Sequence, residues 1–171
     1  WYFWALQEVE FPGAALHADK NSLFKEEDRE KEHNAKNLIR LLTRLLFVWF
    51  VKEKGLIPRE LFDESYVSNE LLLNFRPKKA ARVSGHIHSS YYRAVLQNLF
   101  FATLNQTMGK REFRKPGQHM NVTNLMRYER YFKDSKKFIT LVEQVVPFMN
   151  GGLFECLDRP DSEKKGKQGG E

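Results

Sequence analysis

Residues 37–57 read NLIRLLTRLLFVWFVKEKGLI, and this stretch decides the fold class. Its second half, residues 47–51, is apolar on every side, which is typical of a helix surrounded by protein. We therefore predict a central hydrophobic helix over residues 34–54. Its apolar side chains recur at the three- and four-residue spacing of one helical face: Leu38, Leu41, Leu42, Leu45, Leu46 and Trp49.

The end of this helix carries its own signals. Lys52 and Lys54 suit the negative end of the helix dipole. Gly55 is placed where a left-handed residue ends a helix, and Pro58 follows where a new turn can open. We expect a second, short helix from Pro58 through Phe62.

Three further helices are predicted downstream. Residues 90–107 form the clearest amphipathic pattern, with Ser89 or Ser90 as the cap and Gly109 as the stop. A helix opening at Asn121 or Thr123 would place Leu125, Tyr128 and Phe132 on one face. A last helix capped by Asp134 or Ser135 would turn Phe138, Leu141, Val142 and Val145 inward and end at Pro147.

Strand patterns are scarce, so the predicted fold is mostly α: an irregular helical bundle around a central hydrophobic helix, with long loops. Trp1, Phe3 and Trp4 are expected to face the core. The length of 171 residues suits one domain. We expect a helical scaffold or connector domain over residues 1–157. From 158 to 171 the composition becomes almost entirely polar, which predicts a flexible tail or the start of a truncated segment.

Several classes of protein are disfavoured by composition. The longest apolar run, Leu45 to Val51, is far shorter than the roughly 20 residues of a membrane span. The single cysteine, Cys156, cannot form an internal disulfide, so a cytoplasmic location is expected. The chain begins at Trp1 without a methionine, and we expect it to be a piece of a longer protein.

The net charge of +6 conceals a strong asymmetry along the chain. Residues 1–75 hold 10 basic and 13 acidic side chains, whereas residues 76–137 hold 14 basic and only 3 acidic ones. A net charge of +11 over the second stretch favours a polyanion as partner, because basic side chains neutralise phosphates and release counterions. The candidate DNA-binding residues are Arg76, Lys78, Lys79, Arg82, Lys110, Arg111, Arg114, Lys115, Arg127, Arg130, Lys136 and Lys137.

Three other motifs do not support a catalytic or metal site. His86 and His88 could share a metal on a strand, but no Cys, Asp or Glu lies near them in sequence. Asp161 and Glu163-Lys164-Lys165 resemble a nuclease pattern in a segment with nothing to hold its geometry. Asn150-Gly151-Gly152 is best explained as a turn that directs Leu153 and Phe154 into a core. We therefore predict no catalytic, cofactor-binding or metal-binding residue.

Three segments together resemble one family. They are residues 37–57, quoted above; residues 96–105, LQNLFFATLN; and residues 146–158, VPFMNGGLFECLD. The order of the segments is similar to that in the helical region of type II (IIG-like) restriction-modification enzymes. These are adenine-specific DNA methyltransferases, often with a nuclease in the same chain, and the resemblance covers roughly residues 1–158.

The resemblance implies a restricted role for this chain. In the family the methyl donor, S-adenosylmethionine, is bound by a downstream domain with a glycine-rich motif and an Asn-Pro-Pro-Tyr/Phe motif. Neither motif occurs here, so no catalytic or cofactor residue is carried over. The expectation is a non-catalytic helical part that positions the catalytic domain and contacts the DNA backbone, with DNA and the downstream methyltransferase domain as partners.

Two alternatives remain beside this interpretation. The same helices could form a protein-protein interaction module whose basic face meets an acidic protein. A free-standing metal nuclease would require His86, His88 or Asp161 to bind metal.

Overall fold

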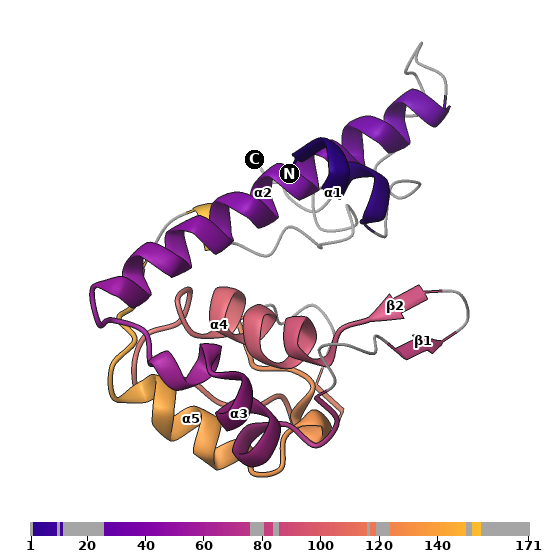
Figure 1. The fold of residues 1–171 in the computed structure, drawn as a ribbon. Coiled ribbons are helices and arrows are strands. Elements are labelled where there is room, and N and C mark those ends of the chain that lie inside the picture. Colours follow the sequence, from indigo (N-terminus) through magenta and orange to yellow (C-terminus); the bar gives the residue numbers. More distant parts are fainter. Residues whose placement is uncertain are drawn as a thin grey trace, which may run out of the picture. The chain divides into compact units, whose positions relative to one another are not determined.

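The computed structural model describes residues 2–9, 11, 26–75, 81–83, 86–115, 117–118, 124–149 and 152–154, with the two strands described by their backbone. These residues are mostly helical, which confirms the predicted fold class (Figure 1). The α-helices are α1 (Tyr2–Glu8), α2 (Glu26–Glu53), α3 (Glu64–Tyr66), α4 (Gln97–Ala102) and α5 (Ser135–Glu143). Short 3₁₀ turns cover Arg59–Phe62, Glu129–Tyr131 and Gly152–Phe154, and π-helical turns cover Val67–Leu71 and Tyr92–Leu96. Strands β1 (Ala81–Val83) and β2 (His86–His88) form an antiparallel hairpin.

Among these residues, two compact units are distinguished, one ending at Phe47 and the other covering Val48–Leu157. In the first unit, the side chain of Asn34 on α2 binds the segment that follows α1. It accepts a hydrogen bond from Phe11 N at 3.0 Å and donates one to Val9 O at 2.7 Å. Ala5 and Leu38 are buried. The domain boundary predicted after residue 157 lies outside the described residues.

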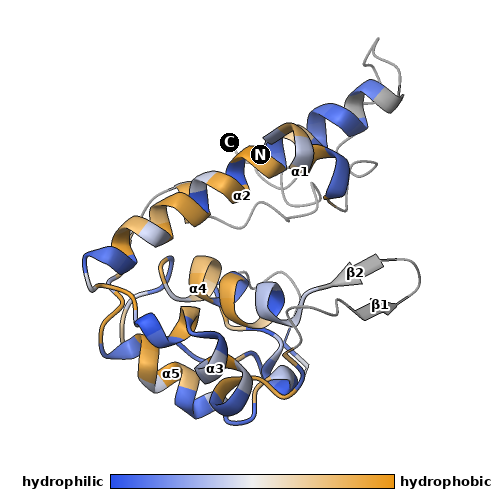
Figure 2. Ribbon diagram, viewed as in Figure 1, coloured by the Kyte–Doolittle hydropathy of each residue, from blue (hydrophilic) through white to orange (hydrophobic). Residues whose placement is uncertain are grey.

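Helix α2 is longer than predicted because its charged start is also helical. The ion pair between Lys36 and Glu32, four residues apart, is of the kind that supports an exposed helical turn. Figure 2 shows this hydrophilic start and the more hydrophobic second half. The end is as predicted: Gly55 has φ +74°, its N–H donates to Lys52 O at 2.9 Å, and Leu56 N donates to Val51 O at 3.1 Å. These two bonds form a Schellman cap.

The prediction that protein surrounds residues 47–51 is wrong for two of them. Val48 and Val51 are buried, but Trp49 and Phe50 are 59% and 55% exposed. The helix is packed on one face, and the apolar residues of its other face reach solvent. The predicted burial of Phe3 and Trp4 on α1 is also wrong, because they are 80% and 57% exposed. Trp1 lies outside the described residues.

The second unit contains a continuous apolar core. Phe132 is central, since its ring lies 5.0 Å from that of Phe138 and 5.5 Å from that of Phe113. Backbone bonds between Leu73 N and Tyr131 O and between Lys133 N and Leu71 O, both 2.9 Å, join the two sides of this core. Its largest fully buried side chains are Val48, Ile57, Leu61, Leu71, Leu72, Leu99, Phe100, Leu104, Met126, Phe138 and Phe154.

Two of the predicted downstream helices differ from the structure. The helix predicted at 90–107 ends earlier, at Ala102, and its first part, Tyr92–Leu96, is π-helical. The Ser89 hydroxyl accepts a hydrogen bond from Tyr92 N, as predicted for the cap. The predicted helix at 121–132 is wrong for the residues described. Met126 instead pairs its backbone with Glu112 and Arg114, and only Glu129–Tyr131 makes a 3₁₀ turn.

Helix α5 agrees with its prediction at the start and on its buried face. The Asp134 carboxylate accepts hydrogen bonds from Lys136 N and Lys137 N, and Phe138 and Val142 are buried. Val145, predicted to face inward, is 39% exposed beyond the end of the helix. Phe154 is buried as expected, whereas the nuclease-like residues Asp161 to Lys165 lie outside the described residues.

Replacement of Gly55 by alanine tests the cap of α2. A Cβ there would meet no atom within 4 Å, so the cost is that of the left-handed backbone alone. We expect Gly55→Ala to lower the free energy of unfolding by about 1 kcal/mol in urea denaturation. Gly152→Ala is the control, because it adds a Cβ to equally open space without a left-handed φ. Equal stability of the two variants would contradict the assigned cap.

Candidate nucleic-acid interface

The twelve predicted DNA-binding residues fall into three groups, and the first is the least described. Arg76, Lys78 and Lys79 lie outside the described residues. Arg82 belongs to β1, opposite Ile87 of β2, and only its backbone is described. DNA binding by this group therefore stays a prediction.

The second group surrounds the loop after α4. Lys110 and Lys115 are exposed, and Arg114 is half-buried. Arg111 differs from them because its side chain has no exposed surface. One short stretch of basic sequence therefore contains both surface cations and a buried one.

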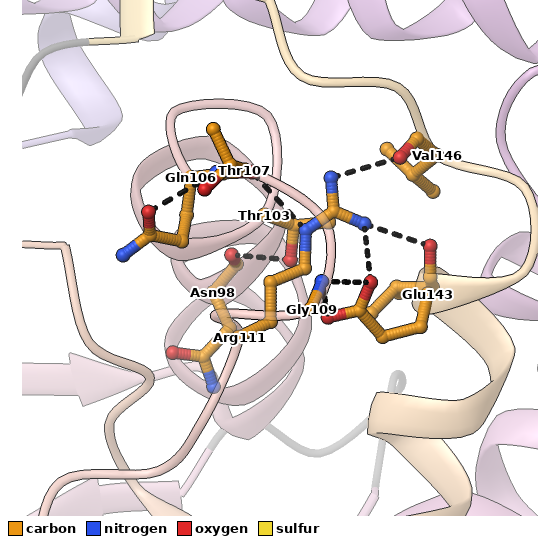
Figure 3. A network of polar contacts seen from close by, with 9 residues as sticks. Asn98, Thr103, Gln106, Thr107, Gly109, Arg111, Glu143 and Val146 are labelled. Carbon is orange, nitrogen blue, oxygen red and sulfur yellow. Dashed lines mark hydrogen bonds and ion pairs between the residues drawn. The ribbon is translucent and has the colours of Figure 1, made fainter.

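The Arg111 guanidinium is held by main-chain carbonyls (Figure 3). It donates to Gln106 O at 3.2 Å, Val142 O at 3.0 Å and Val146 O at 2.8 Å. The Glu143 carboxylate lies 3.7 Å from it and accepts the Gly109 N–H at 3.1 Å. Burial lowers the pKa of Arg111, and the charge of Glu143 opposes that effect. Arg111 joins the end of α5 to the preceding loop and is not available to a ligand.

The third group lies around α5. Arg130, Lys136 and Lys137 are exposed and Arg127 is half-buried. Lys137 forms an ion pair with Glu70 at 2.6 Å, which lowers the pKa of the Glu70 carboxyl and raises that of Lys137. An exposed pair of this kind contributes little stability and leaves Lys137 accessible.

Arg130 belongs to a compact group that sequence reasoning only partly found. We define the tyrosine–arginine cluster as Arg93, Tyr128, Arg130 and Tyr131. Arg93 Cζ lies 6.0 Å from the centre of the Tyr128 ring, and Arg130 Cζ lies 5.6 Å from that of Tyr131. The two rings are 5.8 Å apart. Arg93 was missed because it lies on a predicted amphipathic helix, where an arginine indicates only a solvated face.

Asn98 positions this cluster through the backbone of Arg127. Its side-chain amide donates to Arg127 O and its carbonyl oxygen accepts from Arg127 N, both at 2.7 Å. The next residue, Tyr128, has φ 61° and ψ 33°, a left-handed conformation that is uncommon for an aromatic residue. A buried asparagine thus holds the chain at the point where a strained residue directs its ring toward Arg93.

The electrostatics of the cluster centre on Tyr131. Hydrogen bonding to Arg93 lowers the pKa of its hydroxyl, burial opposes this, and hydrogen bonding to Arg130 adds to the lowering. The nearest acidic residue in sequence, Glu129, accepts a hydrogen bond from Ser135 Oγ at 2.7 Å. Both arginines of the cluster thus favour the ionised form of this half-buried tyrosine.

The described residues contain no group of three His, Cys, Asp or Glu side chains that could hold a metal ion. In the same part of the chain, no helix is long and apolar enough to span a membrane.

Comparison with known proteins gives one informative relative. The chain is 27% identical over 124 residues to a protein of Methanocaldococcus jannaschii named "putative type II restriction enzyme and methyltransferase". The matched segment is 71% of this chain and 7% of that protein. No family model matches the chain, and no solved structure matches it. The similarity supports a relationship to restriction-modification methyltransferases.

Removal of the Arg111 side chain tests its structural role. Arg111→Met leaves three carbonyl acceptors, two of them in buried contacts, and Glu143 without their cation, and we expect the free energy of unfolding to fall by about 3 kcal/mol. Lys110→Met, which removes the same charge from an exposed neighbour, should change it by less than about 0.5 kcal/mol. Urea denaturation measures both, and a stable Arg111→Met protein would refute the assignment.

The titration of Tyr131 tests the cluster electrostatics. Its pKa lies below the ordinary 10.0, so its phenolate forms earlier in the folded than in the unfolded chain. The resulting contribution to stability is present above pH 10 and is lost as pH falls through the lowered pKa. Absorbance titration should show one tyrosine hydroxyl that ionises at a lower pH than the others. This ionisation step should be absent from Tyr131→Phe. In Tyr91→Phe the early step should persist, because burial raises the pKa of Tyr91 to about 12.

Proposed function

We propose that this chain is a non-catalytic helical part of a type II restriction-modification DNA adenine-N6 methyltransferase. Its role would be to position the S-adenosylmethionine-binding catalytic domain and to contact the DNA backbone. The similarity to the M. jannaschii protein carries the proposal, together with the three sequence segments that resemble the family. The chain spans 7% of that protein's length, so the activity of the whole enzyme is part of the proposal.

The residues present do not fit the methyl donor itself. Donor sites of this class use a glycine-rich turn after a parallel strand. The described strands form only an antiparallel hairpin, and the sequence contains no Asn-Pro-Pro. Methyl transfer to adenine would therefore be supplied by the catalytic domain, and this chain would provide support and binding surface.

DNA contact is supported by the basic residues that remain accessible. Lys110, Lys115, Arg130 and Lys136 are exposed within the stretch of net charge +11. Cations of this kind bind phosphates without reading sequence, which is the behaviour expected of a support domain beside a catalytic one. Arg111 is left out of this proposed surface because it is buried.

The positioning role is supported by the exposed apolar side chains of α2. Ile39 and Leu46 in the first unit, and Trp49 and Phe50 in the second, are each more than half exposed. Exposed apolar groups of this size are typical of a surface that binds another protein domain. The same observation favours the alternative function, a helical protein-protein interaction module with a basic face.

The DNA contact can be tested with a labelled duplex of arbitrary sequence. We expect binding whose affinity falls steeply with salt, with a slope of about −0.9 for each phosphate that the chain neutralises. The variant Lys110→Gln/Lys115→Gln/Lys136→Gln should reduce the steepness of that slope by about one for each phosphate that is no longer neutralised. Lys36→Gln is the control for loss of a lysine elsewhere, since Lys36 is exposed on α2 outside the basic stretch, and it should leave the slope unchanged.

Two outcomes would oppose the proposal. A wild-type chain that scarcely binds duplex DNA at low salt would favour the interaction module instead. Methylation of DNA by the purified chain with S-adenosylmethionine would contradict the non-catalytic role.

A further inference from the structure

We propose that the β1–β2 hairpin is a basic arm that lies in the major groove of duplex DNA. The arm is defined as residues 76–89, which contain both strands. The inference rests on the proposed DNA contact and deepens it, because it assigns that contact to one element of the fold and to one groove of the duplex. The arm is distinct from the exposed cations within residues 110–136 that also support the contact.

The base of the arm is closed by two contacts between the residues on either side of it. Ser90 Oγ donates a hydrogen bond to Asn74 O at 3.0 Å, and the rings of Phe75 and Tyr91 lie 5.9 Å apart. The Tyr91 hydroxyl donates to the carbonyl of the buried Leu61 at 2.8 Å, which joins the base to the apolar core of the second unit. The arm therefore leaves and re-enters this unit at one place.

Among the described residues, the two strands of the arm pair only with each other. Their pairing is antiparallel, and Arg82 of β1 stands opposite Ile87 of β2. In Figure 1 the strands lie clear of α3, α4 and α5. A ribbon of two strands about 4.8 Å apart fits the major groove of B-DNA, which is about 12 Å wide. The minor groove, about 6 Å wide, is too narrow for such a ribbon unless the duplex is distorted.

The charge of the arm matches a polyanion. Arg82 lies on β1, and Arg76, Lys78 and Lys79 precede it in the sequence, outside the described residues. No acidic residue occurs from position 71 to position 111, so no carboxylate close in sequence neutralises these cations. Phosphates line both edges of the major groove, and a ribbon with this charge releases counterions when it lies between them.

The composition of the arm favours a duplex over a single strand. Sites for single-stranded nucleic acid stack the bases on aromatic side chains. Residues 76–89 contain no Phe, Tyr or Trp, and no Leu or Met. An arm of this composition has little apolar surface to bury against the protein and no large ring on which a base can stack. Its partner is therefore expected to keep its bases paired.

The first experiment removes the arm and keeps its base. In the armless chain a Gly-Ser-Gly-Ser linker replaces residues 78–88, which removes three positive charges. The matched control, Lys110→Gln/Lys115→Gln/Lys136→Gln, also removes three. We expect the armless chain to bind a labelled arbitrary duplex about tenfold more weakly than the control at the same salt, because it loses the whole groove contact.

A second variant keeps the arm at its natural length and removes only its charge. Lys78→Gln/Lys79→Gln/Arg82→Gln has the same net charge as the control, and we expect it to bind about fivefold more weakly than the control. Circular dichroism and urea denaturation check that each variant is folded. Equal affinity of the two triple variants would overturn the arm and leave the proposed DNA contact intact. Failure of the wild-type chain to bind duplex would overturn both.

Groove-binding dyes and drugs test which groove is occupied. Methyl green binds in the major groove and netropsin in the minor groove of an A·T-rich duplex, and both are dications. We expect methyl green to displace the wild-type chain and netropsin to leave it bound, whereas the armless chain should respond equally to both. Displacement of the wild-type chain by netropsin alone would overturn the major-groove assignment.

A single-stranded oligonucleotide of the same length tests the preference for a duplex. We expect the wild-type chain to bind it about tenfold more weakly than the duplex at the same salt. Equal or tighter binding of the single strand would overturn the inference that the arm recognises a groove.

Discussion

The side-chain amide of Asn98 is the interaction on which the second unit most depends. It is buried in α4 and binds Ala94 O and both polar backbone atoms of Arg127, 29 residues away. Burial of an amide is costly unless its donors and acceptor are used, and here they are. The pairing fixes the backbone just before Tyr128, whose ring lies 6.0 Å from Arg93 Cζ and 5.8 Å from the ring of Tyr131.

The basic residues of this stretch have different structural roles. Arg111 is buried and donates hydrogen bonds to the Val142 and Val146 carbonyls at the end of α5, whereas Lys133, from the same stretch, donates to Ser68 O and Asn69 O. Arg130 and Arg93 lie over tyrosines instead. A net charge of +11 therefore overstates the binding surface, because some of that charge satisfies the ends of helical turns.

Local signals in the sequence predicted local features well. Gly55, Asp134 and Ser89 occupy the caps expected of them, because capping depends on a few neighbouring atoms. The prediction of a helix at 121–132 was wrong for the residues described. The apolar side chains there are spaced as in a helix, but they pack from an irregular segment. Met126 and Phe132 are buried through backbone pairing with distant residues, which periodicity does not reveal.

The sequence by itself determined the helical class, the caps at Gly55, Ser89 and Asp134, the concentration of positive charge and the resemblance to restriction-modification proteins. Each of these depends on neighbours along the chain or on composition. Tertiary structure alone decided that Trp49 is exposed, that Arg111 is buried and that Arg93 lies over the Tyr128 ring. The physical reason is that the burial and the contacts of a side chain depend on residues distant in sequence. The type of the side chain does not specify which of those residues it contacts.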